Sequence, residues 1–405
     1  MKLFATAGFL LASISASASP HWVATWATAP SPMQPDWSAK PALWLEGQTL
    51  HETVHVSLGG SEIRVRLANI FGSHPVYIGA ASVAVAGQPS HPLAFAGHHS
   101  VTIPPDAELV SDPVPVDLPS GGNLSICIFV PARTEAASFH YSASQTVTIE
   151  PGDTTLSSTP VPSALTLHSW VFLAGVDVEA EASAGAIVAF GDSITDGTKS
   201  TDNANHRWPD VLAAVLRSSP ATGRTAVVNA GISGNRLLHD SYGTLSSGIS
   251  ALARFDRDVL VQPGARSVVI LEGINDLGHY GSNAPLSEAV TAADVEGALS
   301  ELAARAHESG LRVYLCTLLP FEGTVYPGYY TPAKNEAREQ INAWIRSNQV
   351  ADGVVDFDLL TRDPAQRRRI LPAYDCGDHL HPNDTGYRAM GTAVAEAITG
   401  HGSAR

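Results

Sequence analysis

Cysteine is scarce in this chain of 405 residues, which contains only three. Three cysteines cannot build a disulfide scaffold, and Cys127, Cys316 and Cys376 lack the C-x-x-C spacing that is typical of zinc and redox sites. One disulfide at most is possible. The sequence leaves open whether Cys316 and Cys376 are bridged.

Basic residues are also few. The chain has 24 Lys and Arg against 39 Asp and Glu, a formal net charge of −15. A surface of that sign repels phosphate backbones and anionic lipid headgroups, so we expect no nucleic-acid partner. Hydrophobic residues make up 44% of the chain and charged residues 16%, which fits neither a disordered chain nor a coiled coil. We therefore expect a globular protein.

Long apolar runs are missing beyond the N-terminus, so we expect no stable membrane anchor. At the N-terminus, Lys2 precedes a mostly apolar stretch, Leu3 to Ala16, and Ala16-Ser17-Ala18 fits a small-x-small cleavage site. The apolar stretch is shorter than the ~20 residues that a membrane span needs. We expect residues 1–18 to be a signal peptide cleaved after Ala18, and the mature protein to be secreted or periplasmic.

The residue pattern changes near residue 180, and we expect two domains. Residues 20–180 alternate polar and apolar side chains between Gly, Pro and Asn, which is typical of antiparallel strands in a β-sandwich or jelly-roll-like module. Residues 185–402 alternate short apolar runs with amphipathic segments of helical length. That rhythm predicts a parallel sheet covered by helices on both faces, with a ligand cleft at the carboxyl ends of the strands.

Five apolar runs are the predicted strands of the parallel sheet: residues 186–190, 225–229, 267–271, 312–316 and 353–357. Five amphipathic segments are its predicted helices: residues 207–218, 245–260, 292–309, 331–348 and 384–398. Residues that directly follow the strands are the candidates for chemistry, because they lie at the edge where the cleft is expected.

Gly191-Asp192-Ser193 directly follows the first of these strands. A serine at such a turn can cap the following helix or act as a nucleophile, and the tripeptide alone does not decide between the two. A nucleophilic serine needs a base for its proton and a carboxylate that orients the base. His381 and Asp378, three residues apart before the last helix, offer both, with His379 as a rival base.

Acyl transfer also needs hydrogen-bond donors for the oxyanion that forms. The loop after the second strand contains Gly231, whose backbone N–H can approach a ligand with no side chain in the way. The loop after the third strand contains Asn275, whose amide is a second candidate donor. Either loop alone would be better explained as a Gly-Asn turn. Four motifs at one sheet edge are hard to explain by chance.

Together these motifs resemble the SGNH hydrolase superfamily, also called GDSL esterases and lipases, over about residues 185–400. The residues that carry the resemblance are Gly191-Asp192-Ser193, Gly231, Gly273-x-Asn275-Asp276 and Asp378-x-x-His381-Pro382. Ile194 stands where the family name has Leu, a swap of similar volume. No Gly-x-Ser-x-Gly elbow occurs in the chain, which disfavours the α/β-hydrolase fold.

The resemblance implies a flavodoxin-like three-layer α/β/α domain and a serine mechanism. Ser193 is the implied nucleophile, His381 the base and Asp378 the residue that orients it. The implied oxyanion hole consists of the Ser193 and Gly231 backbone N–H groups and the Asn275 side chain. The resemblance implies neither a metal nor another cofactor.

The loops after the third and fourth strands are expected to shape the substrate pocket. Their candidate side chains are Leu277, His279, Tyr280, Phe321, Tyr326 and Tyr329. Neither loop identifies a ligand beyond an ester of a small molecule or a glycan. The β-rich module is similar to N-terminal modules of some secreted esterases of the superfamily, and its role is left open.

The sequence thus predicts a secreted serine carboxylic-ester hydrolase that works through an acyl-enzyme on Ser193. A carbohydrate acetylesterase would use the same residues on acetylated glycans, and an acyltransferase would pass the acyl group to an alcohol instead of water. A non-catalytic glycan-binding protein is the alternative from another class, against which the complete residue set argues. Acyl chain length, alcohol moiety and oligomeric state are not readable from the sequence.

Overall fold

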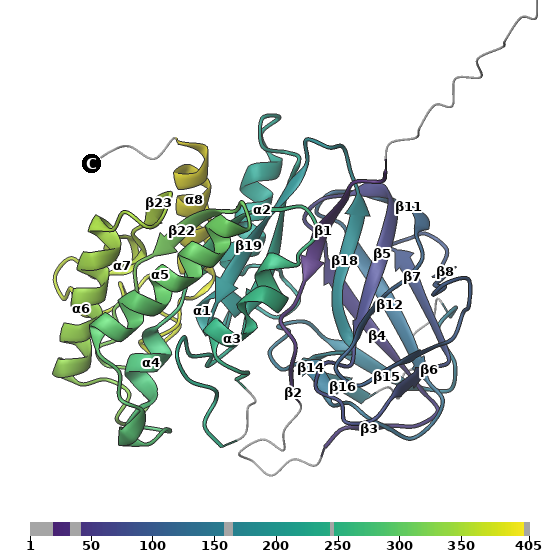
Figure 1. Ribbon diagram of the computed structural model, residues 1–405, viewed down its shortest axis with the longest axis horizontal. Helices are drawn as coiled ribbons and strands as arrows, with labels where there is room; N and C mark the ends of the chain where they lie inside the picture. The colour runs from purple at the N-terminus through teal and green to yellow at the C-terminus, as the bar shows by residue number, and fades with distance from the viewer. Residues whose placement is uncertain (1–18, 33–41, 158–164, 244–246, 401–405) are drawn as a thin grey trace, which may run out of the picture.

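The computed structural model describes residues 19–32, 42–157, 165–243 and 247–400. The expected signal peptide lies outside these residues. The described residues form a β-rich module and, beside it, an α/β domain (Figure 1). Among the described helices, none has the length and apolar character needed to cross a membrane.

The β module is built on two antiparallel sheets. One has the strand order β16 (Leu165–Leu167), β15 (Val147–Pro151), β4 (Gln48–His55), β12 (Asn123–Val130), β7 (Ala80–Val85) and β8 (His91–Pro92). The other has the order β1 (Trp22–Ala27), β18 (Leu173–Glu179), β5 (Gly60–Ala68) and β10 (Glu108–Val110), with β11 (Val114–Leu118) also paired to β5. Alternate side chains such as Leu50, Val54 and Val65 fill the space between them. The predicted β-sandwich-like module is confirmed.

Short strands complete the module. They are β2 (Ser31–Pro32), β14 (Ser138–His140) and β17 (Trp170–Val171) in a three-stranded sheet, and the pairs β3 (Trp44–Leu45) with β13 (Thr134–Glu135) and β6 (Val76–Ile78) with β9 (Val101–Ile103). The three-stranded sheet matters for the site, because its central strand, β14, ends at a buried histidine, His140.

The second domain contains a parallel sheet with helices on both faces, as predicted (Figure 1). Its strand order is β20 (Thr225–Gly231), β19 (Gly185–Gly191), β21 (Ala265–Leu271), β22 (Arg312–Cys316) and β23 (Gly353–Val355). Its helices are α1 (Ser193–Asp196), α2 (Trp208–Arg217), α3 (Ala251–Phe255) with the π-helical turn η1 (Asp256–Leu260), α4 (Ile274–His279), η2 (Leu286–Glu288), α5 (Ala292–Glu308), α6 (Pro332–Ser347), α7 (Phe357–Thr361) and α8 (Asp384–Thr399). The strands are apolar throughout because both faces are covered.

The register of the parallel sheet brings three loops together. Gly191 at the end of β19 pairs with Gly231 of β20 on one side and with Leu271 of β21 on the other. The loops that begin after these residues therefore start side by side at one edge. Ser193 lies on the central one of the three.

Strand β1 contacts both domains, and its side chains contribute to both hydrophobic cores. β1 pairs with β18 in the β module and also lies against β20 of the parallel sheet. Its Val23 and Trp26 side chains belong to the core of the β module, whereas Ala24 and Ala27 pack into the α/β core. The Ala24 N–H donates to the Pro263 carbonyl at 2.8 Å. The predicted boundary falls in the turn between β18 and β19.

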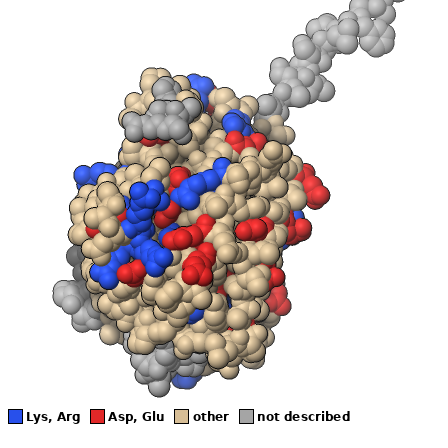
Figure 2. Space-filling view, turned by 90° about the vertical axis from the view of Figure 1, so that its left-hand side faces the viewer, with Lys and Arg blue, Asp and Glu red and all other residues tan. Residues whose placement is uncertain are grey.

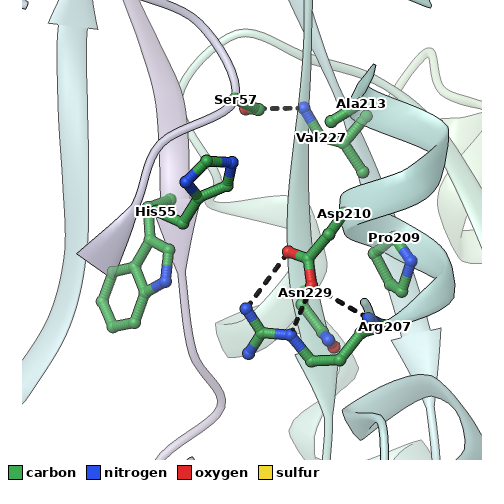
Figure 3. A pocket seen from close by; sticks show the side chains of 9 residues that line it. His55, Ser57, Arg207, Pro209, Asp210, Ala213, Val227 and Asn229 are labelled. Carbon is green, nitrogen blue, oxygen red and sulfur yellow. Dashed lines mark hydrogen bonds and ion pairs between the residues drawn. The ribbon is translucent and has the colours of Figure 1, made fainter. Parts of the chain in front are cut away.

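The edge strand β20 is covered by the β module. The Val227 N–H points out of the sheet and donates to Ser57 Oγ at 2.9 Å, in a pocket that Arg207 and Asp210 of the α2 region also line (Figure 3). An uncovered edge strand exposes unpaired N–H and C=O groups. The module thus closes an edge that would otherwise be open to other chains. The three cysteines are all free.

Candidate active site

Ser193 is the first residue of α1, two residues after the end of β19. The preceding residue, Asp192, caps this helix, because its Oδ1 atom accepts a hydrogen bond from the Ile194 N–H at 2.9 Å. The Ser193 hydroxyl is therefore not needed as a cap. It lies 2.8 Å from Nε2 of His381, a residue 188 positions further along the chain.

His381 is held between Ser193 and a carboxylate. Its Nδ1 atom donates to Asp378 Oδ2 at 2.7 Å, and Asp378 Oδ1 accepts the backbone N–H groups of Leu380 and His381 at 3.0 and 2.9 Å. Burial alone would raise the pKa of Asp378, but the hydrogen bond and charge of His381 outweigh burial and hold that pKa well below its usual range. Asp378 therefore stays ionised and fixes the His381 tautomer that leaves Nε2 free to accept a proton.

The rival histidine points elsewhere. His379 adopts the left-handed backbone conformation, with φ 58°, and its Nδ1 atom bonds to Asp375. Its side chain is exposed at the surface of the turn. Of the two histidines, the structure brings only His381 to Ser193.

The Asn275 side chain is held in one orientation by two hydrogen bonds. Its Nδ2 atom donates to the Asn235 carbonyl at 2.9 Å, and its Oδ1 atom accepts from the Tyr329 hydroxyl at 2.7 Å. The second Nδ2–H is left for a ligand, since a primary amide carries two donors. Asn275 lies on the first turn of α4, after β21, as the sequence predicted.

Gly231 does not fit the role that the resemblance implied. Its N–H already donates to Asn229 Oδ1 at 2.9 Å, so it is not available to a substrate. A Cβ atom there would lie 2.3 Å from the Asp196 backbone nitrogen, so this glycine lets β20 pack against α1. The structure therefore makes Gly231 a packing residue.

Gly234, three residues further on, is better placed than Gly231. Its backbone has φ +78°, and it adjoins Asn235, whose carbonyl holds the Asn275 amide. Among the described residues, neither the Gly234 N–H nor the Ser193 N–H has a hydrogen-bond acceptor. The sequence contains Gly234 in the same loop as Gly231, but no signal in the letters separates the two glycines.

The structure places three of the six candidate pocket residues in the core of the domain. Leu277 and Phe321 are 0% exposed and Tyr329 is 4% exposed. They face the packed interior of the domain, where apolar and aromatic area is best buried. Tyr329 contributes its hydroxyl to Asn275 instead of a wall to a pocket.

The other three candidates remain accessible to different degrees. Tyr326 is 40% exposed, and its ring meets the His381 ring edge-on with 6.4 Å between centroids. His279 is partly buried near Gly234, and burial lowers its pKa to about 4, so it is neutral at pH 7. Tyr280 packs under the Lys334 ammonium group. Tyr326 is thus the candidate that lies beside the base.

Arg254 of α3 is buried and links the three loops through hydrogen bonds. Its guanidinium donates to the Gly191 carbonyl at 2.9 Å, to the Ala230 carbonyl at 2.7 Å and to Asn235 Oδ1 at 2.8 Å. It also reaches Glu272 at 3.3 Å and Asp258 at 3.1 Å. All five guanidinium N–H groups are therefore used.

Three buried carboxyl groups surround this arginine and the site. Burial raises the pKa of Asp192 to about 7 and that of Asp276 to about 6, and it raises the pKa of Glu272 well above its usual range. Asp276 accepts the N–H groups of Leu237 and Leu238 at 2.7 and 2.9 Å. It thereby holds the chain that follows Gly234.

Among the described residues, one cluster has the spacing of metal ligands: Asp375, Cys376 and Asp378. Asp378 already uses both carboxylate oxygens on His381 and the backbone, and Asp375 is bonded to His379. These hydrogen bonds account for the cluster as part of the turn that presents His381.

The face that carries α6 and α7 shows Lys and Arg beside Asp and Glu (Figure 2). Arg346 donates to Asp356 at 2.7 Å and to Asp358 at 2.6 Å, and Arg338 donates to Asp358 at 2.7 Å. Because the charges alternate and pair, this face offers no uniformly basic surface to a polyanion.

Residues 189–389 match the GDSL-like lipase/acylhydrolase family. No curated protein matches the chain. Solved structures that resemble it include a GDSL-like lipase from Bacteroides thetaiotaomicron (22% identity, 53% of this chain and 88% of that chain, TM-score 0.38) and the aryl esterase of M. smegmatis (18%, 54% and 99%, 0.43). A carbohydrate acetylesterase from Sinorhizobium meliloti also matches (14%, 54% and 99%, 0.41). Through residues 189–389 this chain belongs to the GDSL-like lipase/acylhydrolase family, and it is a hydrolase that acts on ester bonds.

Proposed function

We propose that this protein is a serine carboxylic-ester hydrolase whose acyl-enzyme forms on Ser193. The observation that carries the proposal is the continuous hydrogen-bonded chain from Ser193 Oγ through His381 to Asp378, with spacings of 2.8 and 2.7 Å. A serine hydroxyl is a weak nucleophile unless a base with a fixed tautomer takes its proton. His381, held by Asp378, supplies that base.

In the first half-reaction, Ser193 Oγ attacks the ester carbonyl carbon while its proton passes to His381 Nε2. The tetrahedral intermediate collapses, and the same proton goes to the departing alcohol. In the second half-reaction, water attacks the acyl-enzyme, His381 takes a proton from that water, and Ser193 leaves with the proton as the acid is released. Asp378 stabilises the imidazolium in both halves.

We assign the oxyanion hole to the Ser193 N–H, the Gly234 N–H and the free Nδ2–H of Asn275. The two N–H groups have no acceptor among the described residues, and the orientation of the Asn275 amide is fixed by Asn235 and Tyr329. Donors that are held in place before the reaction stabilise the developing charge without reorganisation.

We further propose a preference for short acyl groups. Three of the side chains expected to shape the substrate pocket, Leu277, Phe321 and Tyr329, are packed into the core. Tyr326 remains as an exposed aromatic ring beside His381. This arrangement suits an acetyl-sized acyl group, which is the size that a carbohydrate acetylesterase would remove.

The test is hydrolysis of p-nitrophenyl esters from acetate to palmitate by the parent protein and by Ser193→Ala and His381→Ala. The matched control is His379→Asn, since asparagine tolerates the left-handed backbone at this position. We expect activity on acetate to exceed that on palmitate, to vanish in the first two variants and to persist in the control. Undiminished activity of folded Ser193→Ala would refute the serine mechanism.

Export is a separate proposal, and it rests on the sequence of residues 1–18 alone. Expression with the native N-terminus followed by mass spectrometry tests it. The expected result is a protein outside the cytoplasm that begins at Ser19. A full-length chain retained in the cytoplasm contradicts it.

A further inference from the structure

The β module reaches the proposed oxyanion loop through one buried side chain. His140, the last residue of β14, is 3% exposed and lies at the junction between the domains. Its Nε2 atom is 2.9 Å from Oδ1 of Asp196, the last residue of the helix that begins with Ser193. Its Nδ1 atom is 3.0 Å from the Ala29 carbonyl.

The partners of His140 define its charge. A carbonyl oxygen can only accept, so Nδ1 donates to Ala29. Asp196 accepts two further donors on its other oxygen, the Ser233 N–H at 2.9 Å and the Ser233 hydroxyl at 2.6 Å, as an ionised carboxylate does. Both ring nitrogens of His140 therefore carry protons, and the pair is a buried imidazolium and carboxylate. Burial works against the charged form, but the charge of Asp196 and the hydrogen bonds to Asp196 and Ala29 together outweigh burial and raise the pKa of His140.

The second oxygen of Asp196 holds the loop itself. Ser233, which it binds, directly precedes Gly234, so the contact fixes the peptide that carries the proposed oxyanion donor. The Thr198 hydroxyl lies 2.8 Å from Ser233 Oγ and adds a bond from the segment after α1. Asp196 thus links the helix that begins with Ser193 to the loop that contains Ser233 and Gly234. His140 neutralises the charge of Asp196 and orients its carboxylate.

The β module also forms hydrogen bonds with the segment after α1 and with β20. The Asn203 N–H donates to the Ser144 carbonyl at 3.0 Å, and Asn203 Oδ1 accepts the Thr146 N–H at 2.7 Å. Upstream of the loop, Ser57 holds the edge of β20 (Figure 3). The module therefore contacts β20, the segment after α1 and, through Asp196, the loop between Gly231 and Asn235.

We propose that His140 is a positioning residue of the hydrolase site, supplied by the β module: through Asp196 and Ser233 it holds Gly234 where its N–H meets the oxyanion. The inference rests on the proposed function and extends it, since it makes the module part of the catalytic apparatus. Removal of the contact should act on the transition state, where the oxyanion exists, more than on substrate binding.

The test compares kcat and KM for p-nitrophenyl acetate in the full chain. His140→Phe keeps a ring but no donor, whereas His140→Gln keeps an N–H that can reach Asp196. His51→Phe is the matched control, because His51 is a partly buried histidine of the same module that bonds to Thr154 and lies 3.2 Å from Glu150. Each variant is assayed well below its own melting temperature.

We expect His140→Phe to lower kcat roughly 10- to 100-fold with KM changed less than about threefold, a loss in the range of a misplaced oxyanion donor. His140→Gln should recover most of the loss, and His51→Phe should keep the parent kcat. A parent-like kcat in folded His140→Phe overturns the proposal, and so does an equal loss in His51→Phe. If His140→Phe does not fold, Ser233→Ala carries the test, because it removes the side-chain hydrogen bond between the loop and Asp196, and a parent-like kcat in this variant overturns the proposal.

A second readout separates this inference from the proposed function. Hydrogen exchange at the Ser233 amide, whose N–H donates to Asp196, needs no substrate, and it should be faster by at least about tenfold in His140→Phe than in His51→Phe. Equal exchange in the two variants overturns the inference. A folded parent protein that is inactive on every ester, with the exchange difference present, instead overturns the proposed function alone.

Discussion

The Tyr329 hydroxyl donates to Asn275 Oδ1 across 2.7 Å, and this buried bond, together with the bond from Nδ2 to the Asn235 carbonyl, fixes the orientation of the Asn275 amide. Without the Tyr329 hydroxyl, only the bond to the Asn235 carbonyl holds the amide, and the donor for the oxyanion is less well fixed. Tyr329 therefore serves the site from inside the core.

We expect Tyr329→Phe to lower kcat about 10-fold with little change in KM, because a fixed oxyanion donor acts on the transition state. The matched control is Tyr330→Phe, which removes a hydroxyl that bonds to Glu322 in the same loop. Steady-state kinetics on p-nitrophenyl acetate measure both. If the two variants behave alike, Tyr329 has no special role.

Asp378→Asn should lower kcat by about 10³- to 10⁴-fold, because an amide no longer stabilises the imidazolium and permits the wrong tautomer. The control is Asp352→Asn, which alters a carboxylate that also accepts from a histidine, His307, and from a backbone N–H. That site lies at the other end of the domain, at the start of β22. A modest loss in Asp378→Asn would mean that His381 does not depend on this carboxylate.

Asp192 should make stability depend on pH. Its pKa rises from the ordinary value near 4 in the unfolded chain to about 7 in the folded one, so the folded state binds the extra proton between these values. The contribution of this group is favourable at low pH and is lost as the pH rises from about 4 to about 7.

We expect Asp192→Asn to remove this loss while keeping a good helix cap. Relative to the parent protein, the variant should gain stability from pH 4 to pH 8, by an amount on the order of a few kcal/mol. Urea unfolding of both proteins at pH 4 and pH 8 measures the difference in stability. The raised pKa values of Glu272 and Asp276 are common to both proteins, so their contributions largely cancel. A variant that loses stability relative to the parent over this range contradicts the prediction.

Arg254→Lys should destabilise the protein by about 3 kcal/mol, because an ammonium group cannot replace five directed donors and leaves buried carboxyl groups without partners. Arg305→Lys is the control, since Arg305 is partly exposed and pairs with the exposed Asp256. Its cost should stay within about 1 kcal/mol. Equal unfolding midpoints for the two variants would show that the buried network adds nothing.

Much of the fold and the core of the site were predictable because they depend on local signals. Apolar runs of strand length alternating with amphipathic segments specify a covered parallel sheet, and the ends of its strands meet at one edge. Ser193 and Asn275 follow the ends of predicted strands, and Asp378 and His381 precede the last predicted helix. The loops that carry Ser193 and Asn275 start side by side because the register of β19 and β21 aligns them.

Other features could not be read from the letters. Gly231 and Gly234 differ in whether the backbone N–H is available to a ligand. The Gly231 N–H donates to Asn229, whereas the Gly234 N–H has no acceptor among the described residues. Leu277, Phe321 and Tyr329 were predicted to line the pocket because they lie on loops that follow strands of the parallel sheet. Their burial depends on what packs over them, which is a tertiary property.

The sequence by itself determined the two-domain layout, the parallel sheet and the identity of the serine, histidine and aspartate that meet at its edge, because periodicity and strand-end motifs act over short distances. Only the tertiary structure decided which donors surround the serine, and it alone joined His140 to Asp196 across 56 positions and a domain boundary. Contacts between distant segments depend on packing, and packing has no local signature.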